Sequence, residues 1–67
     1  MYRIETAHGG KLEGGHLLGF SEGRDSIDAC DEFVCAETGR DAIADAYQAL
    51  GITNDDLIAF DLDSPAP

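Results

Sequence analysis

Length is the feature that most constrains this chain. With 67 residues it can bury only about 60% of the surface that its unfolded form exposes. There is room for one domain with a thin core, and none for a deep cleft. Hydrophobic residues make up 43% of the sequence and include three Phe and two Tyr, which is enough for a folded core. We expect a single domain over residues 1–63 and a loose tail over residues 64–67.

The apolar runs are short. The longest, Phe33–Ala36 and Leu57–Phe60, have four residues each, whereas a membrane-spanning helix needs about 20. Residues 1–10 lack the apolar stretch of a signal peptide. The chain has two cysteines, Cys30 and Cys35. So few cysteines are typical of a protein in a reducing compartment, although the sequence does not decide whether the two form a disulfide. We therefore expect a cytoplasmic protein.

The first part of the chain has the pattern of two strands. Tyr2–Thr6 alternates apolar and polar residues, which predicts a half-buried strand with Tyr2 and Ile4 facing the core. His8–His16 holds four of the eight glycines and predicts a flexible connection. A second short strand is predicted over His16–Phe20.

The middle of the chain is ambiguous. Four apolar residues between positions 27 and 34 recur at helical spacing. The run Phe33–Ala36 is nevertheless rich in strand formers. We favour a loop or single turn over residues 23–31, followed by a third strand over residues 32–36.

A helix near Gly39–Leu50 is the most clearly marked element. Thr38 and Asp41 match a capping box, in which the Thr38 side chain accepts a hydrogen bond from the amide of Asp41. An apolar stripe follows at helical spacing, and Gly51 is a typical stop signal. The stripe consists of Ile43, Ala46, Tyr47 and Leu50.

The end of the chain predicts a turn over residues 53–56 and a last strand. In that strand Ile58, Phe60 and Leu62 alternate with less apolar residues, which predicts that these three face the core. With Phe20 and Phe33, Phe60 would give each of the last three strands one core aromatic. The fold class is therefore α+β, with one helix packed on a small, mainly antiparallel three- to four-stranded sheet.

Catalytic and metal-binding patterns are not found in the sequence. His8, His16, Cys30 and Cys35 are residue types that bind zinc, but their spacing fits no zinc finger. There is no phosphate-binding loop, calcium loop or nucleophile elbow. A domain this thin also seldom excludes water from a reaction site. We expect no cofactor, no metal and no enzymatic activity.

The acidic residues are unevenly distributed. Residues 1–24 hold three acids and three bases, whereas residues 25–67 hold eleven acids against Arg40 alone. The second part therefore carries the whole net charge of −10. Acidity that served solubility alone would be spread evenly. The eleven candidate partner-binding residues are Asp25, Asp28, Asp31, Glu32, Glu37, Asp41, Asp45, Asp55, Asp56, Asp61 and Asp63.

Two like-charged pairs are predicted among these acids. Asp41 and Asp45 are expected one turn apart on the outer helix face, so Asp45→Lys should stabilise the fold slightly. Asp61 and Asp63 are expected on one face of the last strand.

Closely spaced carboxylates can imitate a nucleic-acid backbone. Duplex DNA presents one negative charge per about 1.7 Å of its axis, and its protein partners bind it largely through Lys and Arg. An acidic protein can occupy such a basic groove and exclude the DNA. We expect a monomer that binds a basic nucleic-acid-binding protein, with no direct contact to nucleic acid or membrane. A merely solvated acidic face remains the alternative.

In its size, its acidity and one long segment, the chain resembles the small phage-encoded anti-CRISPR proteins. The segment is the expected strand–helix–strand run from Phe33–Thr38 through Asp41–Ala46 to Leu57–Leu62. The resemblance implies a DNA mimic in the host bacterial cytosol. Such an inhibitor binds the DNA-recognition surface of a type I CRISPR surveillance complex and blocks target-DNA binding. The resemblance assigns no residue-by-residue roles.

Two other functions stay open. Residues 37–46, expected to run from a strand into a helix, resemble the small domains of HicB-type antitoxins. That resemblance implies a binding module that neutralises a basic enzyme. The overall acidity is also typical of a structural protein of a phage or a salt-loving organism.

Overall fold

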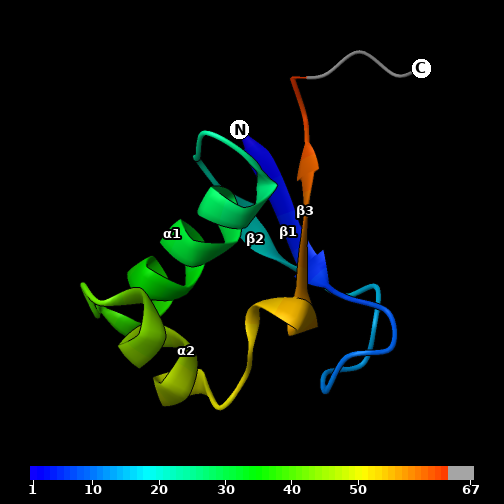
Figure 1. Ribbon diagram of the computed structural model, residues 1–67. Helices are drawn as coiled ribbons and strands as arrows, with labels where there is room; N and C mark the ends of the chain where they lie inside the picture. The colour runs from blue at the N-terminus through cyan, green and yellow to red at the C-terminus, as the bar shows by residue number, and fades with distance from the viewer. Residues whose placement is uncertain (64–67) are drawn as a thin grey trace.

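A computed structural model describes residues 1–63, and these form two helices packed on a three-stranded antiparallel sheet (Figure 1). The elements in chain order are β1 (Tyr2–Thr6), β2 (Leu17–Ser21), α1 (Ser26–Thr38), α2 (Ile43–Leu50), the 3-10 helix η1 (Asn54–Asp56) and β3 (Leu57–Asp61). The strand order is β2-β1-β3, and both pairings are antiparallel. The α+β class is confirmed, but the prediction of a single helix is wrong. The predicted tail over residues 64–67 lies outside the described residues.

The largest correction concerns α1. The loop predicted over residues 23–31 and the strand predicted over residues 32–36 are wrong, because Ser26–Thr38 forms one continuous helix. Asp25 caps its start by accepting a hydrogen bond from the amide of Asp28 at 2.8 Å. Gly39 ends it in the left-handed conformation, with φ of 69°. Two good caps and an apolar stripe at helical spacing outweigh the strand preference of the segment.

The helix α2 is shorter than predicted. It begins at Ile43, and its N-cap Ala42 contributes no side-chain hydrogen bond. The predicted capping box does not form, because Thr38 is the last residue of α1 and its hydroxyl donates to the carbonyl of Val34 at 2.7 Å. The predicted stop at Gly51 is confirmed, with φ of 70°.

The strand β3 presents the face opposite to the one predicted. Its register pairs Ile4 of β1 with Ala59 and Thr6 with Leu57, so Leu57 and Ala59 face the helices. Ile58 and Phe60 consequently lie on the other face of the sheet. Because side chains alternate along a strand, a shift of one residue reverses every side chain. Here the strand begins at Leu57, one residue before the alternation that the sequence suggested.

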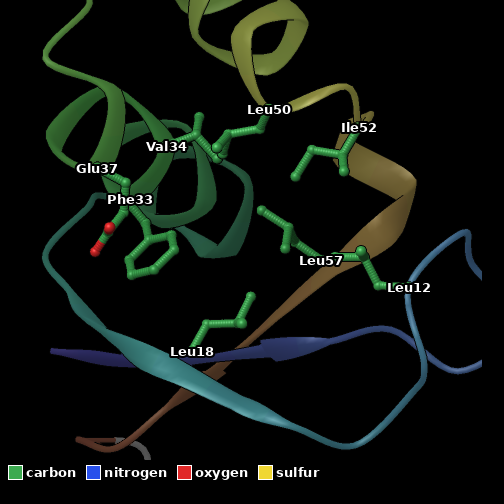
Figure 2. Close-up of a pocket in the computed structure, with 8 residues that line it drawn as sticks. All are labelled: Leu12, Leu18, Phe33, Val34, Glu37, Leu50, Ile52 and Leu57. Atoms are coloured by element: carbon green, nitrogen blue, oxygen red, sulfur yellow. The ribbon is translucent and has the colours of Figure 1, made fainter.

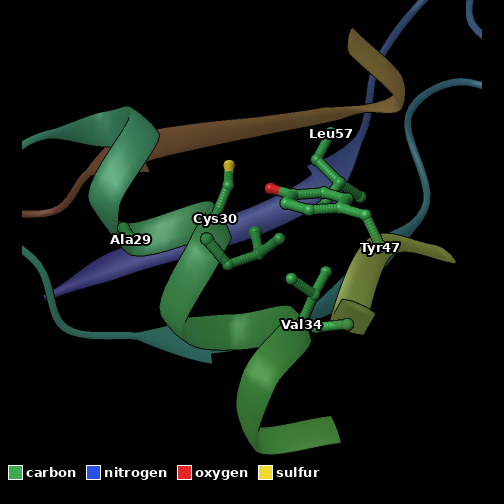
Figure 3. Packing of buried hydrophobic residues seen from close by; sticks show 7 residues of the cluster. Ala29, Cys30, Val34, Tyr47 and Leu57 are labelled. Carbon is green, nitrogen blue, oxygen red and sulfur yellow. The ribbon is translucent and has the colours of Figure 1, made fainter. Parts of the chain in front are cut away.

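The core lies between α1, α2 and the helix-covered face of the sheet (Figure 3). It consists of Ile4, Ala29, Cys30, Val34, Ala46, Tyr47 and Leu57. Of the three Phe, only Phe33 packs against this cluster, whereas Phe20 and Phe60 are exposed. Phe33 reaches the sheet over Gly19, where an added Cβ would lie 2.9 Å from the ring. The core is therefore mainly aliphatic and thin.

Candidate functional site: the acids of the helical layer

Five of the predicted acids are exposed on the helical part of the fold. They make no hydrogen bond or ion pair with any residue in the described range 1–63. They belong to α1, α2, η1 or the connection between the two long helices. We call them the helical acids: Glu32, Glu37, Asp41, Asp45 and Asp55.

The acids at the start of α1 are used as caps. Asp25 is the N-cap, and the Asp28 carboxylate accepts from the backbone amide of Arg24 at 2.9 Å. The Arg24 side chain also lies 3.8 Å from Asp28. Their placement at a helix N-terminus is electrostatically favourable, so local structure alone explains both residues.

Asp31 connects α1 to the rest of the helical layer. Its carboxylate accepts a hydrogen bond from the hydroxyl of the buried Tyr47 at 2.9 Å. The same hydroxyl accepts from the Asn54 side chain at 3.0 Å. Burial, the largest cause, raises the pKa of Tyr47, so the phenol stays protonated and can donate. Asp31 therefore has a structural role and is only partly available to a partner.

The prediction that Asp56 is a partner-binding surface acid is wrong, because its exposed fraction is only 5%. Its carboxylate accepts from the backbone amides of Thr53, at 2.9 Å, and of Lys11. These hydrogen bonds, with that of Thr53 the largest cause, lower the pKa of Asp56. Lys11 is held a second time, since its ammonium donates to the carbonyl of Gly51 at 2.6 Å. Asp56 thus anchors the glycine-rich connection between β1 and β2 to η1.

Asp61 and Asp63 lie near the start of the chain. The Asp63 carboxylate is 2.6 Å from the Met1 nitrogen, and the Asp63 amide donates to Asp61 at 2.9 Å. Because β3 ends at Asp61, the two residues do not form the expected pair on one strand face. Their hydrogen bonds close the end of the sheet beside β1.

Asp41 and Asp45 do not form the predicted pair on one helix. Asp41 lies in the connection before α2, whereas Asp45 lies in the first turn of α2. A carboxylate in a first turn is favoured by the helix dipole. The helix dipole therefore favours a carboxylate at Asp45, where the sequence pattern indicated only repulsion from Asp41.

A small apolar hollow borders this layer and was not expected from the sequence. Its volume is about 290 Å³, and it opens between α1, β2 and the end of α2 (Figure 2). The lining residues are Leu12, Leu18, Phe33, Val34, Glu37, Leu50, Ile52 and Leu57. Glu37 is the only charged residue in that lining. No sequence pattern indicates this hollow, because Leu12 and Leu18 come from segments whose packing depends on the position of α1.

The cysteines and histidines do not form a site. Cys30 and Cys35 are free thiols on α1, and burial raises the pKa of both. Within residues 1–63, no group of three or more His, Cys, Asp or Glu could hold a metal ion.

No helix within residues 1–63 is long and apolar enough to cross a membrane.

Comparison of the chain with protein-family models, with curated proteins and with solved structures gave no match.

Proposed function

We propose that this chain is a non-catalytic binding protein that presents the helical acids to a basic, nucleic-acid-binding surface of another protein. One observation supports this proposal above all: five exposed carboxylates between residues 32 and 55 make no hydrogen bond or ion pair within the described residues 1–63. Hydrogen bonds hold Asp25, Asp28, Asp31 and Asp56 in the fold, whereas none within residues 1–63 holds these five. By filling the partner's basic groove, the protein would exclude DNA from it.

The proposed partner is a DNA-recognising subunit of a type I CRISPR surveillance complex. The placement of charge supports a basic, DNA-binding partner in general. The choice of this particular complex rests on the resemblance, which the fold supports less than the sequence suggested. The segment expected to be strand–helix–strand is helix–helix–strand in the structure. The same correction affects residues 37–46, which span the end of α1 and the start of α2. The local basis for the antitoxin alternative is thereby removed.

A competition titration tests the proposal. A fluorescently labelled target duplex is bound to a purified type I surveillance complex, and its anisotropy is followed as the acidic protein is added. We expect displacement that weakens with added salt, because a charge-dominated contact is screened. Displacement that ignores salt would contradict the proposal.

A matched pair of variants locates the surface. The variant Glu32→Lys should weaken displacement, since close charge pairs at interfaces contribute about 1.5 kcal/mol or more each. The control is Glu13→Lys, whose side chain is 89% exposed in the β1–β2 connection and should behave as wild type. Equal loss in both variants would show that only total charge matters. Unfolding of the wild type at low salt, seen in thermal melts, would favour the halophile alternative.

A further inference from the structure

The face of the sheet that the helices leave uncovered is apolar. Both helices lie on one side of the sheet (Figure 1). On the other side, Leu17, Phe20, Ile58 and Phe60 are 58%, 54%, 43% and 39% exposed. Together with Arg3 and Glu5 they form what we call the open sheet face. Exposed apolar patches of this kind mark interaction surfaces more often than isolated apolar residues do.

The register arranges these six side chains in two rows. Arg3 pairs with Phe20 on one side and with Phe60 on the other. Glu5 pairs in the same way with Leu17 and Ile58. Each row therefore has a charged residue on the central strand between two apolar residues.

The two charges compensate each other within the chain. The Arg3 guanidinium lies 4.9 Å from the centre of the Phe60 ring, and its Nε is 2.6 Å from a Glu5 oxygen. Within residues 1–63 that Nε makes no aligned hydrogen bond, so the contact with Glu5 is an ion pair only. The open sheet face is thus neutral on a protein of net charge −10, whereas the helical acids belong to the helices and their connections.

We propose that the open sheet face binds the same face of a second copy of this chain. A neutral, apolar face offers nothing to a strongly basic partner, but it can cover its own equivalent. Face-to-face stacking would also place the two acidic helical layers on the outside of the dimer. The monomer expected from the sequence is replaced by this proposal, which does not depend on the proposed function.

Charge selects one symmetry for the dimer. A twofold axis that lies between the sheets and perpendicular to β1 puts Arg3 opposite Glu5 of the second copy. It also puts each Phe opposite an aliphatic residue, because the row of Arg3 then covers the row of Glu5. An axis parallel to β1 would place Arg3 opposite Arg3. The first axis gives the self-complementary contact that an isologous interface requires, with the strands of the two sheets within about 30° of each other.

The small area indicates a weak dimer. Three strands of five residues cover about 17 by 14 Å, or roughly 240 Å² before the side chains at the edges are counted. Stable interfaces bury about 800 Å² per partner. We therefore expect weak, reversible dimers, because interfaces below the standard size belong to transient complexes. A dissociation constant on the order of 10 to 100 μM represents such a weak complex.

Sedimentation velocity of two charge-reversal variants tests the proposal without any other protein. The experiment uses about 0.3 M NaCl to screen the repulsion between two acidic chains. Wild type should be dimeric at several hundred micromolar, on the order of ten times the expected constant, and monomeric at about 1 μM. Arg3→Glu and Glu5→Arg should each dimerise at least about tenfold more weakly, because each places like charges opposite one another.

An equimolar mixture of the two variants is the decisive sample. The acid introduced at position 3 then faces the base introduced at position 5, and the natural pair forms on the other side of the axis. We expect the mixture to regain wild-type dimerisation. The control Ile43→Lys, at an exposed apolar position on α2, should dimerise as wild type, and circular dichroism checks that every variant is folded.

The proposal is overturned if the wild type stays monomeric at all concentrations. It is also overturned if folded single variants dimerise as well as wild type, or if the mixture of folded variants stays monomeric. None of these outcomes bears on displacement of DNA by the helical acids, so the two proposals can fail separately.

Discussion

The two faces of β1 belong to two different surroundings. Ile4 and Thr6 point to the helices and are buried, whereas Arg3 and Glu5 point to the open sheet face. The helix-covered face holds the fold together through a thin aliphatic core. The open face holds larger apolar side chains, Phe20 and Phe60, that the monomer barely uses. The size and hydrophobicity of a side chain therefore do not identify the core residues of so small a protein. Its two helices cover only one face of the sheet, so large apolar residues on the other face stay exposed.

The helical layer and the open sheet face also differ in charge. We expect binding through the helical acids to weaken as salt is added, since attraction to a basic surface is screened. We expect self-association through the open sheet face to strengthen, since the repulsion between two chains of charge −10 is screened as well. Opposite salt dependences would assign the two activities to two separate surfaces.

The largest expected effect separates the two faces of the sheet. Ile4→Ala should lower the free energy of unfolding by about 2 to 5 kcal/mol, because Ile4 is 0% exposed and its removal leaves a cavity. Phe60→Ala should cost the monomer only about 0.5 to 1 kcal/mol, mainly through the lost contact with Arg3. Urea denaturation at about 1 μM protein, below the expected dimer constant, measures both. Equal losses would contradict the division between the two faces.

The next effect concerns an acid that belongs to the fold and not to the helical acids. Asp56→Asn should lower the melting temperature by on the order of 5 °C, because the carboxylate accepts backbone amides from Thr53 and Lys11. The matched control is Asp55→Asn, one residue earlier and exposed, which should melt as wild type.

The lowered pKa of Asp56 predicts how its contribution to stability changes with pH. The folded pKa of Asp56 lies below the ordinary value of 3.8, so its stabilising contribution is fully present above that value. It is lost as the pH falls from there through the lowered folded pKa. The difference in melting temperature between wild type and Asp56→Asn should be constant near neutrality and should shrink below pH 3.8. A difference that stays constant down to about pH 2 would contradict the role of the ionised carboxylate.

Sequence reasoning succeeded where the signals were local and unopposed. The first strand, the stop at Gly51 and the α+β class followed from alternation and glycine placement. The helix α1 was missed although its signals were present: Asp25 ahead of Asp28 as a cap, and Gly39 as a stop. Gly39 also fits the start of the next helix, and residues 33–36 are strand formers, so the local signals in this segment oppose one another.

The candidate site was less predictable than the fold. The concentration of acids was visible in the sequence, but their division into structural and free carboxylates was not. Asp56 and Asp31 are held by partners distant in sequence, Lys11 and Tyr47. The orientation of β3 is similarly set by packing of Leu57 under the helices. Such choices depend on tertiary contacts that no local pattern encodes.

A smaller effect is expected from the hydrogen-bonded phenol in the helical layer. Tyr47→Phe should cost about 1 to 2 kcal/mol, because both Asp31 and Asn54 lose their partner. The control Tyr2→Phe should be nearly neutral, since the Tyr2 hydroxyl makes no hydrogen bond within residues 1–63.

The raised pKa of Tyr47 also predicts a pH dependence. The unfolded phenol ionises above pH 10.0 while the folded one does not, so its contribution is present below that pH and is lost above it. The stability gap between wild type and Tyr47→Phe should therefore close as the pH rises past 10.0. Chemical denaturation at neutral and alkaline pH measures the gap, and a gap that widens would contradict this assignment.

The smallest effect tests whether a helical acid is neutral to the fold. The sequence suggested that Asp45→Lys would stabilise the protein by removing repulsion from Asp41. In the structure Asp41 lies outside α2 and Asp45 occupies its first turn, where a lysine opposes the helix dipole. We now expect a loss of about 0.3 to 1 kcal/mol at low salt, reduced at high salt by screening. Asp45→Asn, which removes the charge without reversing it, should lose less than Asp45→Lys. Thermal melts of both variants in a salt series measure these two losses of stability. Stabilisation by Asp45→Lys would contradict the dipole argument and would support repulsion between Asp41 and Asp45.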